Sequence, residues 1–133
     1  MLRYMADTNI CIFVLKGSIP TLQGRFNRHA QQLCISTITV AELRSGAERS
    51  RRVPENHHEI EQLQARIEVL DFDSDAASHY GQIRHQVRRQ PVGHLDALIA
   101  GHARSRGLTL VTDNVSEFSR VPGLQIENWI RRP

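Results

Sequence analysis

The 133-residue chain has only two cysteines and a single lysine, and it lacks long apolar runs. Cys11 and Cys34 can form one pair at most and match no zinc-ligand spacing, so neither a disulfide framework nor structural zinc is expected. No apolar stretch approaches the ~18 residues of a membrane helix, and the first residues lack the apolar region of a secretory signal. We therefore expect a soluble, cytoplasmic protein with free thiols and no membrane partner.

The basic residues are almost all arginine. Lysine and arginine together number 17 against 14 acidic residues, which gives a formal charge of +3. Because the planar guanidinium suits two-pronged phosphate contacts, this bias slightly favours nucleic acid as a partner. A GC-rich coding sequence explains the same bias equally well. Aromatic residues make up only 5% of the chain, and no stacking platform for single-stranded bases is evident.

Short apolar runs alternate with helical stretches along the whole chain. The predicted strands are 3–6, 33–36, 69–72 and 108–112, with a further edge strand within 124–129. The predicted helices are 8–16, 20–30, 37–49, 59–68, 74–89 and 95–106, and the predicted loop is 50–58. This alternation predicts an α/β fold, with a parallel sheet of four to five strands covered on both faces. No linker divides the chain, so residues 1–133 are expected to form one domain.

Four acidic residues occupy positions where α/β proteins place their chemistry. Asp7 and Asp113 each end a predicted strand, while Glu42 and Asp96 lie in predicted helices. Ligands of an open parallel sheet bind beyond the carboxyl ends of its strands, so we expect these four side chains to converge there. Such a cluster needs hard cations, protons or a basic partner as compensation. The favoured interpretation is a magnesium-dependent phosphodiesterase site.

Each of these residues also has a purely structural explanation. Asp7 can cap the helix that follows it, and Asp96 in a first helical turn is stabilised by the helix dipole. Glu42 lies off the apolar stripe of its helix and forms a capping-box pattern with Thr39, although Thr37 can cap that helix instead. The four residues in this order are therefore more informative than any one of them.

The run from Asp71 to Asp73 resembles the aspartyl-phosphate motif of haloacid-dehalogenase-type phosphatases. That motif normally opens its domain and needs a downstream lysine, whereas Lys16 lies upstream. The same run starts like an EF-hand loop, but the glycine and the glutamate that such a loop requires are replaced. We interpret Asp73, or one of the two residues after it, as the cap of the next helix.

The four acidic residues lie in segments 5–9, 36–43, 96–103 and 110–114. Together these segments resemble the PIN-domain ribonucleases, and among them the VapC toxins of bacterial toxin–antitoxin pairs. The resemblance runs from about Met1 to Trp129. Within that family the chain resembles a subgroup cutting initiator tRNA, which carries Asp-Thr-Asn-Ile-Cys-Ile-Phe near its start and Ile-Ala-Gly-His-Ala-Arg-Ser-Arg-Gly near its end.

By this resemblance the chain folds as a three-layer α/β/α PIN-like domain that binds one or two Mg²⁺ ions, or Mn²⁺. The implied catalytic residues and metal ligands are Asp7, Glu42, Asp96 and Asp113. The fourth position is open between Asp113, which can carry charge, and Asn114, because related chains often have Asp or Asn two residues after the threonine. The residues implied to support these ligands are Asn9, Thr112 and Asn114.

The resemblance also implies an endoribonuclease toxin that hydrolyses phosphodiesters, with initiator tRNA cut in its anticodon loop. Its implied partners are a VapB-type antitoxin, a second copy of the chain in a homodimer, and operator DNA reached only through the antitoxin. Two alternatives stay open. One is a catalytically weak PIN-fold module that binds RNA or acts as a corepressor, and the other is a small Mg²⁺-dependent phosphatase using Asp71 and Asp73.

Overall fold

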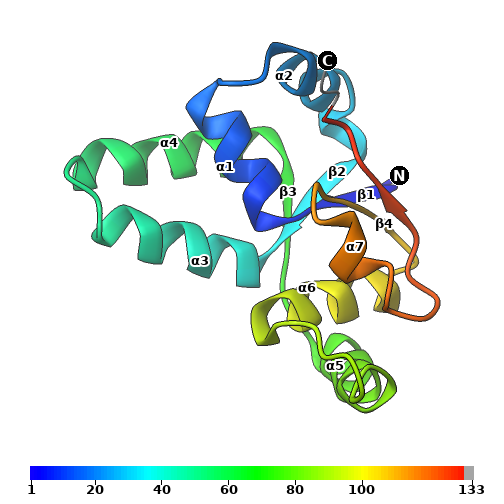
Figure 1. Ribbon diagram of the computed structural model, residues 1–133. Helices are drawn as coiled ribbons and strands as arrows, with labels where there is room; N and C mark the ends of the chain where they lie inside the picture. Colours follow the sequence, from blue (N-terminus) through cyan, green and yellow to red (C-terminus); the bar gives the residue numbers. More distant parts are fainter. Residues whose placement is uncertain (131–133) are drawn as a thin grey trace.

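Residues 1–130 are described by a computed structural model in which strands and helices alternate (Figure 1). The strands are β1 (Tyr4–Ala6), β2 (Leu33–Ser36), β3 (Glu68–Leu70), β4 (Thr109–Val111) and β5 (Ile126–Glu127). The helices are α1 (Thr8–Lys16), α2 (Pro20–Arg28), the 3-10 turn η1 (Ala30–Gln32), α3 (Thr37–Glu48), α4 (Val53–Arg66), α5 (Ser74–Gln86), α6 (His94–Ser105) and α7 (Val115–Phe118). The last three residues of the predicted domain, 131–133, lie outside the described residues.

The five strands form one parallel sheet, as the alternating pattern predicted, and their order is β3-β2-β1-β4-β5. The chain builds the sheet outward from β1 to β3 and then returns to the other side of β1 with β4. In such sheets the reversal opens a crevice at the carboxyl ends of the two central strands. Those ends are Asp7 and Thr112, and the Asp7 N–H donates to the Val111 carbonyl at 3.0 Å.

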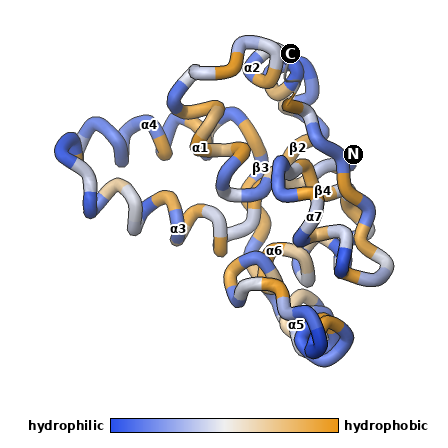
Figure 2. Tube along the Cα trace, viewed as in Figure 1, coloured by the Kyte–Doolittle hydropathy of each residue, from blue (hydrophilic) through white to orange (hydrophobic). Residues whose placement is uncertain are grey.

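Helices cover both faces of the sheet, so the predicted three-layer α/β/α architecture is confirmed (Figure 1). Tyr4 and Ala6 belong to a core cluster with α1 to α4, whereas Met5 between them belongs to a second cluster with α5, α6 and α7. This alternation follows from the two-residue period of a strand. Cys11 and Cys34 are buried free thiols, as expected. Figure 2 shows that the far end of the α3–α4 pair is hydrophilic.

Local capping fixes the two helices that start at the carboxyl edge of the sheet. Asp7 caps α1, because its Oδ1 accepts a hydrogen bond from the Ile10 N–H at 2.9 Å. Ser36 caps α3 by accepting from the Ile38 N–H at 3.0 Å. The capping-box prediction for Thr39 and Glu42 is therefore wrong, and both side chains are left for other contacts.

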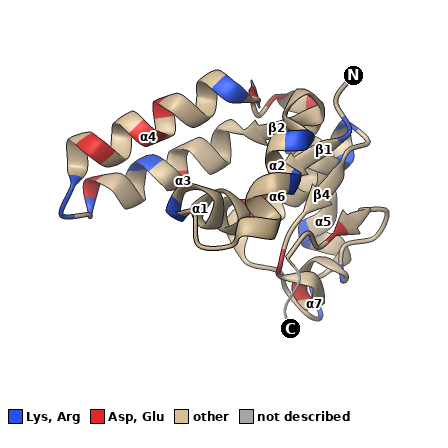
Figure 3. Ribbon diagram, turned by 90° about the horizontal axis from the view of Figure 1, so that it is seen from above, with Lys and Arg blue, Asp and Glu red and all other residues tan. Residues whose placement is uncertain are grey.

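The loop expected over 50–58 is much shorter than predicted. α4 begins at Val53, and Pro54 lies in its first turn, where a missing N–H costs nothing because that group has no helical partner. Proline and the histidine pair suggested a loop, whereas the residues form two more turns of helix. Smaller corrections concern ends: α2 stops at Arg28, α5 stops at Gln86, and β3 covers 68–70. Arginines gather at the α3–α4 connection and acidic residues along α4 (Figure 3).

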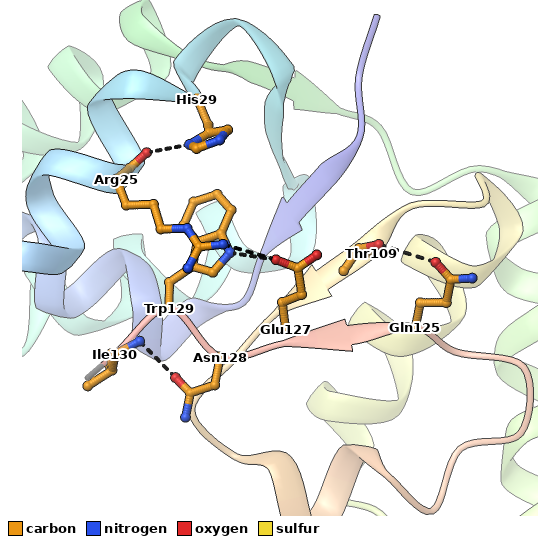
Figure 4. A network of polar contacts seen from close by, with 8 residues as sticks. All are labelled: Arg25, His29, Thr109, Gln125, Glu127, Asn128, Trp129 and Ile130. Carbon is orange, nitrogen blue, oxygen red and sulfur yellow. Dashed lines mark hydrogen bonds and ion pairs between the residues drawn. The ribbon is translucent and has the colours of Figure 1, made fainter. Parts of the chain in front are cut away.

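The segment after β5 is fixed by a group of residues that we call the Trp129 cluster (Figure 4). The Arg25 guanidinium lies 4.8 Å above the centre of the Trp129 ring and 3.3 Å from Glu127 Oε1. The indole N–H donates to the same carboxylate oxygen at 3.0 Å. Tyr4 and His29 pack their rings against the indole with centroids 5.0 and 5.1 Å away.

Within residues 1–130, no helix has the length and apolarity needed to cross a bilayer.

Candidate active site

The four sequence-predicted acidic residues lie at the carboxyl edge of the sheet. Asp7 follows β1, Asp113 follows β4, Glu42 lies in α3 after β2, and Asp96 lies in the first turn of α6. Asp7 lies close enough to Asp113 and Glu42 to be repelled by their negative charges. Asp96 is repelled in the same way by Asp7 and Glu42. The fold thus brings together four residues that are spread over more than a hundred positions of sequence.

Asp7 is the most buried member of this group, with only 4% of its surface exposed. Its Oδ2 accepts a hydrogen bond from the Thr112 hydroxyl at 2.5 Å, while Oδ1 accepts from the Ile10 N–H. Burial raises the pKa of Asp7, and the Thr112 hydrogen bond offsets part of that rise. One side chain therefore serves both as helix cap and as a fixed carboxylate of the cluster.

Glu42 is oriented by the first turn of α1. The Thr8 hydroxyl donates to Glu42 Oε1 at 2.6 Å and lies 3.1 Å from the Thr39 hydroxyl. Asn9, the next residue of α1, is exposed. Asn9 and Glu42 both line a groove of about 670 Å³ between α1, α3 and α4. The glutamate is thus fixed through one oxygen at the mouth of an open groove.

Glu117, which the sequence analysis did not single out, hydrogen-bonds to Asp96. Burial and this contact raise the pKa of Asp96 to about 7. Burial also acts to raise the pKa of Glu117, but hydrogen bonds from the Gly93 N–H, Asp96 and Asn114 outweigh it and leave that pKa lowered. The pair therefore shares one proton near neutral pH, and Asp96 carries it.

The Glu117 carboxylate is held by the loop before α6 and by the end of β4. The Gly93 N–H donates to Oε1 at 2.8 Å, and the Asn114 amide donates to Oε2. Asn114 is fixed in turn, because its N–H donates to the Thr112 hydroxyl at 2.9 Å. A Cβ atom at Gly93 would lie 3.7 Å from Glu117 Oε1 and 3.8 Å from Asp96 Oδ2, so the loop backbone packs against both carboxyl groups.

Asp113 and Asn114, the two residues considered for the fourth position, serve different sides of the cluster. Asp113 acts electrostatically on Asp7, and its Oδ1 accepts a hydrogen bond from the Asn128 amide at 3.0 Å. Asn114 instead contacts Glu117. A signal for Glu117 was present in the sequence, because Asn114 and Glu117 have the spacing of a capping box.

Four carboxylates of the cluster carry negative charge without a cation in direct contact. Across the described residues 1–130, no basic nitrogen lies within 4.0 Å of the carboxylates of Asp7, Glu42, Asp96 or Glu117. Carboxylate oxygens are preferred ligands of hard divalent cations. In that same part of the chain, no three acidic, histidine or cysteine side chains already stand close enough to hold an ion. The donor set fits a divalent cation, whose binding would displace the proton held by Asp96 and Glu117.

The two residues of the phosphatase alternative have other surroundings. Asp73 caps α5, because its Oδ1 accepts from the Ala76 N–H at 3.0 Å, as the sequence predicted. Asp71 is an exposed residue of the connection between β3 and α5. In the described part of the chain, neither Asp71 nor Asp73 is among the groups that act on the carboxyl groups of Asp7 and Asp96. The geometry gives the phosphatase alternative no support.

The PIN-domain family model matches residues 4–124, which includes every residue of the carboxylate cluster. The chain belongs to the PIN-domain family. It is 51% identical over 131 residues to the tRNA(fMet)-specific endonuclease VapC of Shigella flexneri, covering 97% of this chain and 99% of that relative. The family resemblance predicted from four short segments is thus confirmed, and PIN-domain nucleases in general depend on divalent metal ions.

Solved structures of PIN-domain proteins give the same result. The chain superposes on the DNA-bound VapBC complex of Salmonella typhimurium with a TM-score of 0.92 and 49% identity, covering 97% of this chain and 99% of that one. It superposes on VapBC2 of Rickettsia felis bound to a promoter DNA fragment with a TM-score of 0.89 and 32% identity, covering 96% and 99%. Both relatives were therefore solved together with an antitoxin and DNA.

Proposed function

We propose that this PIN-domain protein is the toxin of a type II toxin–antitoxin pair and acts as a metal-dependent endoribonuclease. The observation that carries the proposal is the group of carboxylates at the carboxyl edge of the sheet, of which Asp7, Glu42 and Asp96 have no basic group within 4.0 Å in the described residues. The chain is 51% identical over 131 residues to a tRNA(fMet)-specific endonuclease, which supports initiator tRNA as the substrate. We further propose the anticodon loop as the place of cleavage, as the family resemblance implies. That substrate implies a cytoplasmic site of action.

Five carboxylates are available to hold Mg²⁺, or Mn²⁺ in its place: Asp7, Glu42, Asp96, Asp113 and Glu117. A bound divalent ion lowers the pKa of its water ligand and neutralises charge on the phosphate. The chain's own part is to fix the ligands in advance. Thr112 orients Asp7, Asn114 orients Glu117, and Asn9 stands at the groove beside Glu42.

Glu42 is suited to receive the proton of the attacking water. Its Oε1 is held by the Thr8 hydroxyl at 2.6 Å, which leaves Oε2 to accept. The water oxygen forms the new bond to phosphorus as the bond from phosphorus to the 3′ oxygen breaks, and the leaving oxygen takes up a proton. The products are a 5′-phosphate and a 3′-hydroxyl.

A VapB-type antitoxin is the proposed protein partner, because both superposed relatives are VapBC complexes. The groove between α1, α3 and α4 begins at Glu42 and is the surface on which an antitoxin segment could block the carboxylates. We further propose that the toxin forms a homodimer within the complex and reaches operator DNA only through the antitoxin. In this arrangement residues 1–133 act as a single domain.

The proposal is tested with purified protein freed of antitoxin, incubated with total cellular RNA and Mg²⁺. Parallel reactions contain EDTA or the Asp7→Asn variant, and all new 5′ ends are sequenced. Asparagine is as good a helix cap as aspartate, so this variant removes the charge while keeping the cap of α1. One dominant cut in initiator tRNA, absent from both controls, is the expected result.

Two outcomes contradict the proposal. RNA that stays intact with folded, metal-loaded protein would leave a PIN-fold binding module or corepressor as the function. Activity that survives Asp7→Asn but is lost in Asp71→Asn would move the chemistry to the connection after β3. The Asp71→Asn variant is also a matched control, because it removes one equally small carboxylate at an exposed position.

A further inference from the structure

A hollow of about 510 Å³ lies where α5 ends and the chain turns toward α6. Its lining consists of Gln86, Val87, Arg88, Arg89, Gln90 and Arg120. We call this surface the arginine hollow. Half of its residues are arginine and none is acidic, so the only charges that line the hollow are positive. Its volume lies within the range of ~300–1,000 Å³ that small-molecule sites occupy.

The arginines of the hollow form no close ion pairs in the described part of the chain. Of the ion pairs formed there, none includes Arg88, Arg89 or Arg120. Arg88 donates to the His85 carbonyl at 2.9 Å and Arg120 donates to the Pro91 carbonyl at 3.0 Å, both of which are neutral acceptors. The charges of Arg88 and Arg89 are therefore available to an anion from outside the molecule, whereas the charge of Arg120 also acts on Glu117.

The hollow adjoins the carboxylate cluster through two short chain segments. Gln90 and Gly93 are three residues apart, so their Cα atoms are at most ~11 Å from each other. Gly93 itself packs against Glu117 and Asp96. On the other side, the Arg120 N–H donates to the Glu117 carbonyl at 3.2 Å, and the Arg120 charge helps to lower the pKa of Glu117. A polyanion that crosses the carboxylates thus has a basic hollow beside it.

We propose that the arginine hollow holds the phosphodiester backbone of the substrate RNA next to the bond that is cut. This inference rests on the proposed nuclease function and adds the surface that positions the strand. No aromatic side chain lines the hollow, so it lacks the aromatic platform on which single-strand binders stack bases. The contact is therefore to phosphates, and it contributes affinity without reading sequence.

The test removes two hollow charges and compares them with two removed elsewhere. Arg88 and Arg89 are exposed residues outside any helix, so R88Q/R89Q leaves the core untouched. The matched control is R51Q/R66Q, which removes the same charge from exposed positions before and at the end of α4. Both pairs are placed in the Asp7→Asn background, so that binding is measured without cleavage. The probes are a fluorescein-labelled initiator-tRNA stem-loop and an unrelated stem-loop of equal length.

We expect R88Q/R89Q to weaken binding of both stem-loops by about tenfold near physiological salt. The slope of log affinity against log salt should become shallower by ~1.4, the value for two phosphate contacts on a single strand. The R51Q/R66Q control should keep both the affinity and the slope. Equal behaviour of the two variants would overturn the proposal. So would loss of binding to a purified antitoxin with RNA binding intact, which would make the hollow a protein contact.

Cleavage assays separate this proposal from the one it rests on. In the otherwise wild-type chain with Mg²⁺, R88Q/R89Q should raise KM about tenfold and leave kcat unchanged, because the hollow holds the strand away from the reacting atoms. RNA that binds through the hollow but is never cut would contradict the nuclease function alone. RNA that is cut with an unchanged KM would contradict the hollow alone.

Discussion

Two neighbouring groups of charged residues differ in whether a cation lies next to their carboxylates. In the Trp129 cluster the Arg25 guanidinium and the Glu127 carboxylate lie 3.3 Å apart, and the indole contacts both of them. In the carboxylate cluster no cation of the described chain lies within 4.0 Å of Asp7 or Asp96. A balanced cluster needs nothing further to be stable, whereas an unbalanced one is stable only with protons or a ligand. The difference separates a structural cluster from a functional one.

The largest effect should follow from removing the most buried charge of the unbalanced cluster. We expect Asp7→Asn to lower kcat/KM for RNA cleavage by about 10³-fold or more, because it removes a ligand that Thr112 has already oriented. EDTA should abolish the activity of the wild type, and Mg²⁺ should restore it. Thermal unfolding of Asp7→Asn should stay close to that of the wild type, since the helix cap is kept. If Asp7→Asn lowered Tm enough to account for its loss of activity by unfolding, the result would speak against a catalytic role.

The balanced cluster should respond in stability rather than activity. Trp129 is 1% exposed, so Trp129→Ala leaves a cavity and should reduce the free energy of unfolding by about 3–5 kcal/mol. Urea denaturation measures the loss. Trp129→Phe keeps most of the volume and should lose less. Cleavage by either variant, corrected for the folded fraction, should match the wild type, and a specific loss of kcat would place this cluster in the mechanism.

Glu117 and Asp113 are distinguished by their neighbours. Glu117 hydrogen-bonds to Asp96 and to the loop that carries it, so Glu117→Gln should lower kcat about 10²-fold. Asp113→Asn should lower it by about tenfold or less, because that side chain acts on Asp7 only through its charge. Single-turnover cleavage of a tRNA stem-loop measures both. The reverse order would return Asp113 to the fourth position predicted from sequence.

The comparison also explains which parts of the protein were predictable from sequence. The parallel sheet and its cover of helices on both faces followed from the alternation of apolar runs and helical stretches, and Tyr4, Met5 and Ala6 accordingly alternate between two cores. The order of the strands was not predicted. Asp7 and Asp113 were singled out because each ends a predicted strand, Asp96 because it lies in the first turn of a predicted helix, and Glu42 because it lies in the helix after a predicted strand. Their contacts with one another are tertiary and are not encoded in any local spacing.

The predictions from sequence were wrong where one local pattern is compatible with two different structures. Pro54 is compatible with a loop and with a first helical turn, and packing of Ile60 and Leu63 on the core decided for the helix. Glu117 was overlooked because its capping-box spacing with Asn114 indicates only the start of a helix, and the sequence does not reveal that Gly93 comes to lie beside it. Asp96 and Glu117 are more than twenty positions apart, so only the fold makes them share a proton.

In metal-free protein the unbalanced cluster should give an unusual pH dependence. The folded-state pKa of Asp96 is about 7, above its ordinary value of 3.8. Its contribution to stability is therefore complete below the unfolded pKa and is lost as pH rises through about 7. In EDTA, the free energy of unfolding should rise as pH falls from about 8 to 5. Asp96→Asn should flatten this profile, and Mg²⁺ should reverse it by favouring the ionised form.

The smallest effect should come from the ion pair of the balanced cluster. Arg25 and Glu127 have side chains that are 31% and 41% exposed, so water screens their attraction. Glu127→Gln keeps an oxygen to accept the indole N–H and removes only the charge. We expect it to change the free energy of unfolding by about 0–1 kcal/mol, the usual worth of an exposed pair. Salt titration of the two proteins should converge as screening increases. A loss as large as that of Trp129→Ala would mean that charge, rather than the buried indole, holds β5 and the segment after it in place.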